Sequence, residues 1–450
     1  MTTQKLSGIN RILVGFTLFS MFFGAGNLIF PPSLAAQAGV NTGQAISGFM
    51  ASAVGLPVLG VAAVALSGGL PKLADRVGPR FSFLFVLLIY LSIGPCLAIP
   101  RTASTSFEMT MLPLMAEMGI HLEGRMAGVS HQTMAQFLYS LLFFLIAMLL
   151  AFRPEKLTDR LGKILCPALL TLIAVLFLGC LVWPMGQAGE AAEIYGSQPA
   201  VRGFLDGYQT MDTIAALNFG IIIALNIQNR GVSQERAVVR ETVIAGMIAG
   251  VLMMAVYGIL AYIGMPVGGR AGEGANGARI LTFVAGSLFG NAGKMILGVI
   301  FFIACLNTCT GLLSCCSQYF TTILPRIGYR AWVFLFALIS LFISSAGLDR
   351  ILAFSVPVLN AIYPIAIVLI VLAFLHPFLG QWEKVYPCAI LFTGIVSGVY
   401  ALESAKVISS QMCMIFHQWL PGYSIGLGWI LPAGIGILSG ILLGIKIKGR

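Results

Sequence analysis

A short run near the amino terminus, Gly24-Ala25-Gly26-Asn27, is a poor sequence for continuous helix although apolar residues flank it on both sides. Pro31 and Pro32 follow one turn later and remove two helical N–H donors. An unwound turn here would free backbone N–H and C=O groups, which a membrane tolerates only where they line a cavity. A half-helix starting near Asn27 would point its positive end at that cavity and suit a carboxylate, and the free carbonyls would suit a small cation.

A second polar run, from Asp206 to Thr213, interrupts another apolar stretch. Its Asp212 sits so deep in the stretch that a charged, unpaired carboxylate would cost several kcal/mol. Three roles stay open for Asp212: pairing with a substrate ammonium, binding or relaying a coupling ion, or capping the helix that follows. Asp206 lies closer to the end of the stretch, where simple solvation is an equally good explanation.

The elements that must position these residues are membrane-spanning helices. Of the 450 residues, 58% are hydrophobic and 9% charged, and the mean hydropathy is +0.95, whereas soluble proteins carry about 25% charged residues. Apolar stretches of eighteen or more residues recur along the chain, which predicts an all-α polytopic membrane protein, and the first stretch is expected to be a spanning helix rather than a cleaved signal. We predict about twelve helices. They cover residues 8–38, 44–68, 81–101, 132–152, 161–184, 200–227, 238–265, 291–323, 331–347, 351–375, 385–403 and 425–446.

The basic residues indicate an orientation for these helices. The chain carries a net charge of +10 with 26 lysines and arginines, but no basic run that would favour nucleic acid. Eight of them fall in connections on one side: Arg101, Arg125, Arg202, Arg270, Arg279, Lys294, Arg350 and Lys406. The other 18 fall on the side that holds both termini, which predicts cytoplasmic termini. The longer outer connections, for example around Ile280 to Phe289, contain short apolar pieces that could form external helices.

The helix spacing also predicts an internal repeat. Shifting residues 8–184 by about 190 positions places five helices on the five of 200–375, in opposite orientation, as in many secondary transporters. Residues 385–446 would form two additional helices. Glycines in membrane helices often serve only close packing. Two interrupted helices at repeat-related positions, one with a buried carboxylate, favour a binding site instead.

Several ordered motifs resemble one family, the bacterial branched-chain amino acid:cation symporters of the BrnQ type. They are Phe23-Gly24-Ala25-Gly26-Asn27-Leu28-Ile29-Phe30-Pro31-Pro32, Val54-Gly55-Leu56-Pro57-Val58-Leu59, Gly94-Pro95 with Pro100-Arg101-Thr102-Ala103, and Gly207-Tyr208 with Thr210-Met211-Asp212. The likeness covers nearly the whole chain. The resemblance implies the amino acid–polyamine–cation superfamily and its five-plus-five inverted-repeat fold, which LeuT exemplifies.

The resemblance further implies sodium-driven uptake of leucine, isoleucine and valine. The substrate-binding residues would be Gly24, Ala25, Gly26, Asn27, Tyr208, Gln209, Thr210 and Asp212. The N–H groups of Ala25 and Gly26 would hold the carboxylate, and the carbonyls from Tyr208 to Thr210 the ammonium. A sodium site would use the carbonyls of Ser20, Phe23 and Ala304 with the side chains of Asn307 and Thr308. Asn307 departs from the hydroxyl residue expected there, although an amide oxygen also coordinates hard cations.

Other classes of protein fit the sequence less well. The four histidines lie in loops or at helix ends, and neither H-E-x-x-H nor G-x-S-x-G occurs, which argues against a membrane-embedded enzyme. Nothing suggests the repeated rings of a channel filter. The nine cysteines fit buried apolar positions, and no cofactor is expected besides the coupling ion. A proton-coupled carrier, another small amino acid as cargo, and either a monomer or a dimer stay open. The resemblance places the protein in a bacterial cytoplasmic membrane.

Overall fold

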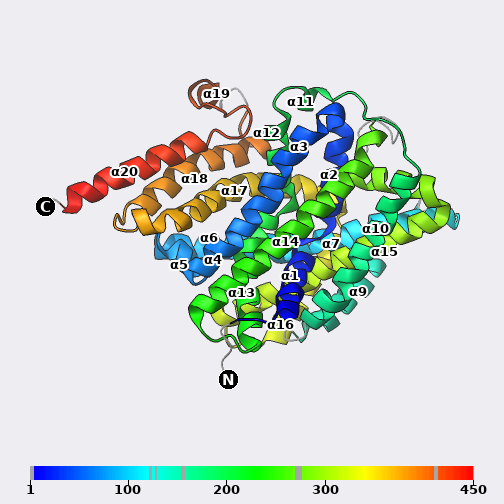
Figure 1. Cartoon of the computed structure of the whole chain (residues 1–450), viewed down its shortest axis with the longest axis horizontal. Coiled ribbons are helices and arrows are strands. Elements are labelled where there is room, and N and C mark those ends of the chain that lie inside the picture. Colours follow the sequence, from blue (N-terminus) through cyan, green and yellow to red (C-terminus); the bar gives the residue numbers. More distant parts are fainter. Residues whose placement is uncertain are drawn as a thin grey trace.

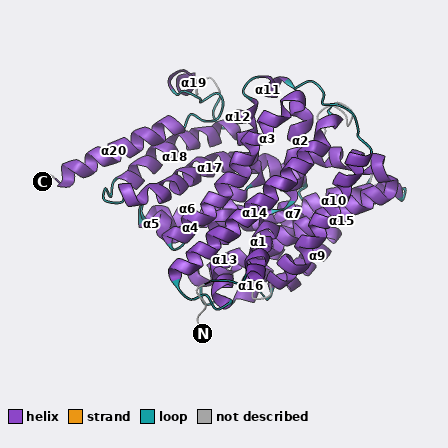
Figure 2. Cartoon of the chain, in the orientation of Figure 1, coloured by secondary structure: helices purple, strands orange, loops and turns teal. Residues whose placement is uncertain are grey.

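The protein is almost entirely helical. The computed structural model describes residues 5–120, 124–126, 129–153, 158–268, 276–409 and 414–448 (Figures 1 and 2). Within these ranges the only strands are β1 (Arg125–Met126) and β2 (Val129–Ser130), which form one antiparallel pair of two residues each. The expected all-α class therefore holds apart from this ribbon.

The helical segments follow one another with few long connections. In chain order they are α1 (Gly8–Phe22), α2 (Ala25–Ala38), η1 (Gly39–Asn41), α3 (Thr42–Met50), η2 (Ala51–Gly55), α4 (Leu56–Ser67), α5 (Leu70–Asp75), α6 (Pro79–Leu91), η3 (Ser92–Cys96), α7 (Ala98–Ser106), η4 (Phe107–Met111), α8 (Leu112–Glu117), α9 (His131–Ala151), η6 (Thr158–Leu165), α10 (Cys166–Val182), α11 (Glu193–Gly196), α12 (Pro199–Asp206), η7 (Gly207–Thr210), α13 (Asp212–Asn229), α14 (Glu235–Gly264), η8 (Met265–Val267), α15 (Gly277–Ile323), α16 (Tyr329–Ser344), α17 (Leu348–Leu379), α18 (Val385–Ser404), α19 (Met414–Trp419) and α20 (Ile430–Lys448).

The helices are long and apolar enough for a multi-pass membrane protein. In the described ranges, eight helical stretches meet the length and hydropathy of a spanning segment, or nine if the bent pair of α12–η7 and α13 is one span. Three shorter apolar helices, at Gly8–Phe22, Tyr329–Ser344 and Ile430–Ile445, accompany them. Predicted and observed boundaries agree within a few residues for most segments, for example 132–152 with α9 and 385–403 with α18.

The third helix is longer than predicted. Instead of ending at residue 101, it continues through α7, η4 and α8 to Glu117, with non-helical backbone at Gly94. Two of the hydroxyl residues in this extension form hydrogen bonds inside the bundle. Ser104 donates to the carbonyl of Ser344 at 2.9 Å, and Thr102 to that of Ile99 at 2.6 Å. Assigning Arg101 to an outer connection was therefore wrong, because its side chain is only 6% exposed.

The apolar piece around Ile280 to Phe289 is helical, as expected. It forms the first part of α15, which bends at Gly290, where the backbone takes a φ of +58°. Arg270, also assigned to this outer connection, lies outside the described residues. At the carboxyl end, α18 packs between α17 and α20, and these helices extend from one side of the bundle (Figure 1).

Close packing around the second broken helix depends on glycine. A Cβ at Gly203 of α12 would lie 1.9 Å from the carbonyl oxygen of Ala45 in α3, and one at Gly48 of α3 would lie 1.8 Å from that of Ala200. Real side chains cannot approach backbone so closely. The two glycines therefore let α3 and α12 touch along their backbones, the kind of small-residue contact that holds membrane helices together.

Candidate functional site

The first helix is broken where the glycine-rich run predicts. α1 ends at Phe22, Phe23 and Gly24 leave helical geometry, and α2 restarts at Ala25, two residues before the predicted position. Gly24 lies against Thr308 of α15, where a Cβ would come within 2.7 Å of the threonine Oγ1. The break therefore leaves the first N–H groups of α2 without helical partners in the interior of the bundle.

The second break lies between α12 and α13. η7 carries the chain from Gly207 to Thr210, Met211 takes a left-handed φ of +66°, and α13 begins at Asp212 with the axis turned by 48°. A positive φ is uncommon for a residue with a side chain. The N–H of Asp212 points at the Thr210 hydroxyl at 3.4 Å. At this junction the Tyr208 carbonyl still accepts from the N–H of Met211 at 3.0 Å, whereas the carbonyls of Gln209 and Thr210 accept from a side chain of another helix.

A buried polar network joins the two breaks. The amide nitrogen of Asn27 donates to Asp212 Oδ2 and to the Tyr257 hydroxyl, both at 2.5 Å, and the Tyr257 hydroxyl reaches the same carboxylate oxygen at 3.3 Å. The N–H of Gly24 donates to Asn27 Oδ1 at 3.1 Å. Because α2, α13 and α14 each contribute one side chain, these hydrogen bonds form only when the three helices lie close together. Asp212, 3% exposed, is thus hydrogen-bonded rather than free.

Arg101 of α7 lies between the same two breaks. Its Nη1 donates to the carbonyl of Gln209 at 3.0 Å and its Nη2 to that of Thr210 at 3.4 Å. On the other side, a Cβ at Gly26 would lie 3.0 Å from Nη2. The guanidinium therefore occupies the space between the first turn of α2 and the carbonyls predicted to take an ammonium.

These groups enclose a small cavity, which we call the central cavity. Its volume is about 30 Å³, room for about two waters, whereas sites for small molecules usually measure about 300–1,000 Å³. It is lined by Met21, Phe22, Gly24, Ala25, Asn27, Ile93, Ala98, Arg101, Thr102, Thr210, Met211, Asp212, Ala215, Thr308 and Leu312. Both signs of charge and several apolar side chains meet there.

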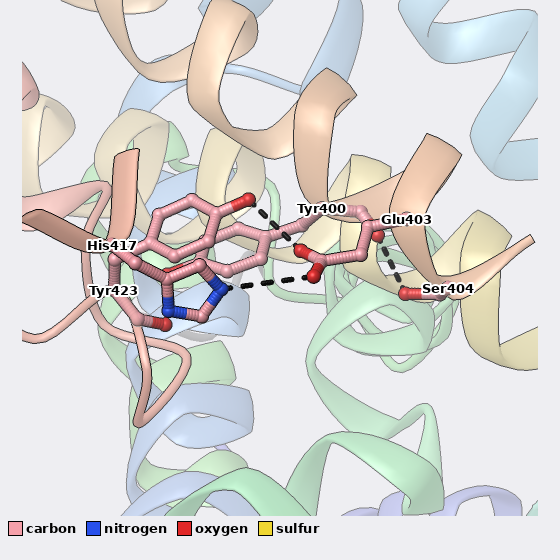
Figure 3. Close-up of polar contacts among 5 residues, drawn as sticks. All are labelled: Tyr400, Glu403, Ser404, His417 and Tyr423. Atoms are coloured by element: carbon pink, nitrogen blue, oxygen red, sulfur yellow. Dashed lines mark hydrogen bonds and ion pairs between the residues drawn. The ribbon is translucent and has the colours of Figure 1, made fainter. Parts of the chain in front are cut away.

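A much larger cavity, the outer chamber, lies on the other side of η7. It has a volume of about 850 Å³ and reaches Tyr208 and Gln209, while Thr210 to Asp212 line the central cavity. Part of its wall is the polar group of Figure 3, in which Glu403 accepts from the Tyr423 hydroxyl at 3.0 Å and lies 3.7 Å from His417 Nε2. The chamber opens among α12, α17, α18 and the connection to α20, on the side predicted to be outside.

At the opposite end of the bundle, charged side chains join α1 to the second half of the chain. Arg11 of α1 donates from Nε and Nη2 to both carboxylate oxygens of Glu241 in α14, at 2.6 and 2.5 Å. Arg230 donates to Asn10 Oδ1 at 2.7 Å. The Glu241 side chain is 1% exposed. The amino-terminal half of the broken first helix is thereby fixed to the second half of the chain.

The residues proposed for sodium lie at the end of α1 and on α15, two helices that contact each other. Ser20, Ala304 and Asn307 are fully buried, and Asn307 donates to the Ser20 hydroxyl at 3.2 Å. Asn307 Oδ1 and Thr308 Oγ1 are buried oxygens without a hydrogen-bond partner in the described part of the chain. Buried oxygens are normally paired. Unpaired hard oxygens in this position fit a small cation with oxygen ligands.

The structure brings together most, but not all, of the residues predicted to bind substrate, and it adds two that were not predicted. Gly24, Ala25, Asn27, Thr210 and Asp212 line the central cavity, Gly26 lies beside Arg101, and Tyr208 and Gln209 face the outer chamber. Arg101 and Tyr257 were missed as site residues. A charged residue inside the Pro100–Ala103 motif was a usable signal for the first, whereas a single tyrosine in an apolar stretch gave none for the second.

Comparison with known proteins identifies the family. The family model described as branched-chain amino acid transport protein matches residues 7–447. The chain belongs to this family. The branched-chain amino acid permease BraB of Bacillus subtilis is 39% identical over 96% of this chain and 95% of its own length. The branched-chain amino acid transport system 2 carrier protein of Pseudomonas aeruginosa is 38% identical over 97% of this chain and 96% of its own. This family member is accordingly a transporter and not an enzyme.

A solved structure shows the same fold at low identity. Mhp1, a nucleobase-cation-symport-1 family transporter in a closed conformation with bromovinylhydantoin bound, aligns with a TM-score of 0.61 and 12% identity, covering 97% of this chain and 92% of that one. The transporter therefore shares the backbone plan that Mhp1 uses.

Proposed function

We propose that this protein is a secondary symporter that imports leucine, isoleucine and valine, coupled to sodium by alternating access. The observation that carries the proposal is the central cavity, where the N-terminal turn of α2 and Arg101 lie opposite Asp212 and the carbonyls of η7. Opposed groups of both signs with apolar walls suit the zwitterion of an aliphatic amino acid. The names of the relatives supply the class of substrate.

The architecture we propose for this function has twelve spans in a bacterial cytoplasmic membrane, with both termini in the cytoplasm. Residues 8–184 and 200–375 would be the two inverted repeats, each beginning with a broken helix. The breaks at Gly24 and Met211 support this assignment because they fall at corresponding places in the two halves. The outer chamber would then be the extracellular vestibule, and the Arg11–Glu241 contact would close the cytoplasmic side.

Sodium coupling rests on the cluster between α1 and α15. The carbonyls of Ser20, Phe23 and Ala304 with Asn307 Oδ1 and Thr308 Oγ1 would supply five oxygens without a buried net charge. The ion would join the end of α1 to α15, directly beside the Gly24 break. Binding there would fix the break in the geometry that holds the substrate.

The test is leucine uptake into proteoliposomes under a sodium gradient, a proton gradient, or neither. We expect sodium-driven uptake that isoleucine and valine compete for. Thr308→Ala should raise the sodium concentration for half-maximal uptake about tenfold or more, as the loss of one charge-assisted ligand is worth about 1.5–3 kcal/mol. Thr321→Ala is the matched control, since that hydroxyl on the same helix donates to the carbonyl of Ser317.

A second candidate is proton coupling through Asp212. The observation that favours it is a carboxylate buried inside the helical bundle and connected to Asn27 and Tyr257 by hydrogen bonds. Uptake driven by a proton gradient without sodium, abolished in Asp212→Asn, would replace the sodium proposal. Absence of leucine uptake under every gradient, in protein shown to be folded, would contradict both.

A further inference from the structure

Among the described residues that line the central cavity, Arg101 is the only basic one, and the proposed function leaves its role open. We propose that Arg101 binds the carboxylate of the substrate, and that its hydrogen bonds to η7 are exchanged for hydrogen bonds to that carboxylate. The carbonyls of Gln209 and Thr210 that it releases would then accept the substrate ammonium. The inference rests on the proposed function, which supplies an amino acid as ligand.

The position of the guanidinium supports this exchange. It reaches from α7 across the gap between two broken helices, with the carbonyls of Gln209 and Thr210 on one side and Gly26 on the other. An arginine has five N–H donors. Only two hydrogen bonds are found for Arg101 among the described residues, so donors remain for a ligand.

The chemistry of the two partners favours the exchange. Arg101 now donates to two neutral carbonyl oxygens, one of them at 3.4 Å. A carboxylate would offer two charged oxygens that match the planar fork of the guanidinium, and such bidentate pairs are about twice as strong as neutral hydrogen bonds. The first N–H groups of α2, beside Gly26, would donate to the same carboxylate.

The charge balance of the cavity gives the exchange its selectivity. Arg101 and Asp212 both line the central cavity, so their charges offset each other. A zwitterion adds a carboxylate beside Arg101 and an ammonium beside the carbonyls and Asp212, which leaves the net charge unchanged. An amine without a carboxylate adds an uncompensated positive charge, and a carboxylic acid without an amine adds a negative one, each costly in a buried site.

A purely structural role for Arg101 predicts something different. If the guanidinium only holds the carbonyls of η7, its removal should weaken every ligand of the cavity by a similar factor. If the guanidinium binds the carboxylate, its removal should weaken the binding only of ligands that carry a carboxylate. Leucine and leucinamide differ in this group and share the ammonium and the side chain, so their affinity ratio separates the two roles.

The experiment measures competition of leucine and leucinamide against radiolabelled leucine on purified full-length protein, for the wild type, Arg101→Gln and Arg101→Lys. We expect the wild type to prefer leucine strongly, and Arg101→Gln to lose about 10- to 100-fold in leucine affinity while leucinamide binding stays constant. Arg101→Lys keeps the charge but not the fork and should recover part of the loss. Arg76→Gln is the matched control, because this half-buried arginine is bonded to Tyr386 and neither residue lines the central cavity.

Gly26→Ala provides an independent variant that leaves Arg101 in place. Its Cβ would lie 3.0 Å from Nη2 and displace the flexible end of the side chain. It should reduce the leucine-to-leucinamide ratio in protein whose elution profile and thermal stability match the wild type. Equal losses for both ligands in Arg101→Gln and Gly26→Ala, or unchanged leucine affinity, would overturn the role of Arg101. Failure of the wild type to bind leucine at all would instead refute the proposed function.

Discussion

The network at Asp212 leads to a quantitative prediction, because the bond between Tyr257 and the carboxylate can be deleted without changing the packing. Tyr257 is fully buried in α14, and its ring packs edge-on against Phe49 at a centroid distance of 5.3 Å. Tyr257→Phe keeps this ring and removes only the hydroxyl, so no large cavity forms. The Tyr257 hydroxyl joins α14 to α2 by a hydrogen bond with Asn27, and to α13 by a hydrogen bond with Asp212.

A hydrogen bond to a charged group contributes about 1.5–3 kcal/mol. The variant also removes the hydroxyl that accepts from Asn27. Asn27 still donates to the carboxylate, so we expect a total loss of about 1.5 kcal/mol, or roughly tenfold in an equilibrium constant. The bond forms only when α2, α13 and α14 approach as they do here. If α2, α13 and α14 keep this approach around bound leucine, Tyr257→Phe should raise the leucine dissociation constant about tenfold.

A double-mutant cycle with Asp212→Asn makes the test sharper. Once the carboxylate is neutral, the tyrosine hydroxyl bonds to an amide and is worth about 0.5–1.5 kcal/mol, so Tyr257→Phe should cost about threefold in that background. Dissociation constants from equilibrium binding of radiolabelled leucine measure all four corners. Tyr262→Phe, on the same helix but 41% exposed, is the control. Equal effects of Tyr257→Phe in both backgrounds, or none beyond the control, would refute the reasoning.

Two further predictions concern packing and the closed cytoplasmic end. Gly203→Val should abolish the accumulation of monodisperse protein, since its Cβ would lie 1.9 Å from a backbone oxygen of α3. Gly43→Ala is the control and should accumulate normally, because nothing lies within 4 Å of a Cβ at that position. Size-exclusion chromatography of a fluorescent fusion compares the two variants. Glu241→Gln should speed hydrogen–deuterium exchange in α1, because Arg11, the partner of the buried Glu241 carboxylate, lies on that helix. Glu235→Gln, at an exposed position of the same helix α14, should leave exchange in α1 unchanged.

The breaks of the two helices could be predicted because their cause is local. Glycine at positions 24 and 26, proline at 31 and 32, and a carboxylate at 212 are unfavourable in continuous membrane helix wherever the chain folds. The exact junctions depend on neighbours. Gly24 rather than Asn27 marks the first break because Thr308 packs directly against it.

The location of Arg101 could not be predicted by the same reasoning. A hydropathy profile places the end of a span at a charged residue. The serines and threonines that follow Arg101 lower the hydropathy further and also favour a loop there. In the structure the guanidinium of Arg101 donates to carbonyls of η7, the hydroxyl of Thr102 donates to a carbonyl of its own turn, and that of Ser104 to a carbonyl of α16. Both partners are created by tertiary structure, so no window of sequence around residue 101 contains them.

The same tertiary contacts connect recognition to movement. The central cavity, at about 30 Å³, is too small for leucine, while the outer chamber of about 850 Å³ ends at the other face of η7. Under the proposed function, a substrate in the chamber can enter only if η7 moves. Arg101 holds η7 through the carbonyls of Gln209 and Thr210, and Asp212 holds the junction behind it through Asn27. A zwitterionic ligand would place its carboxylate at Arg101 and its ammonium at Asp212, and so would replace both sets of contacts at once. Amines or acids would replace only one, so the groups that recognise the zwitterion are also those whose exchange admits it.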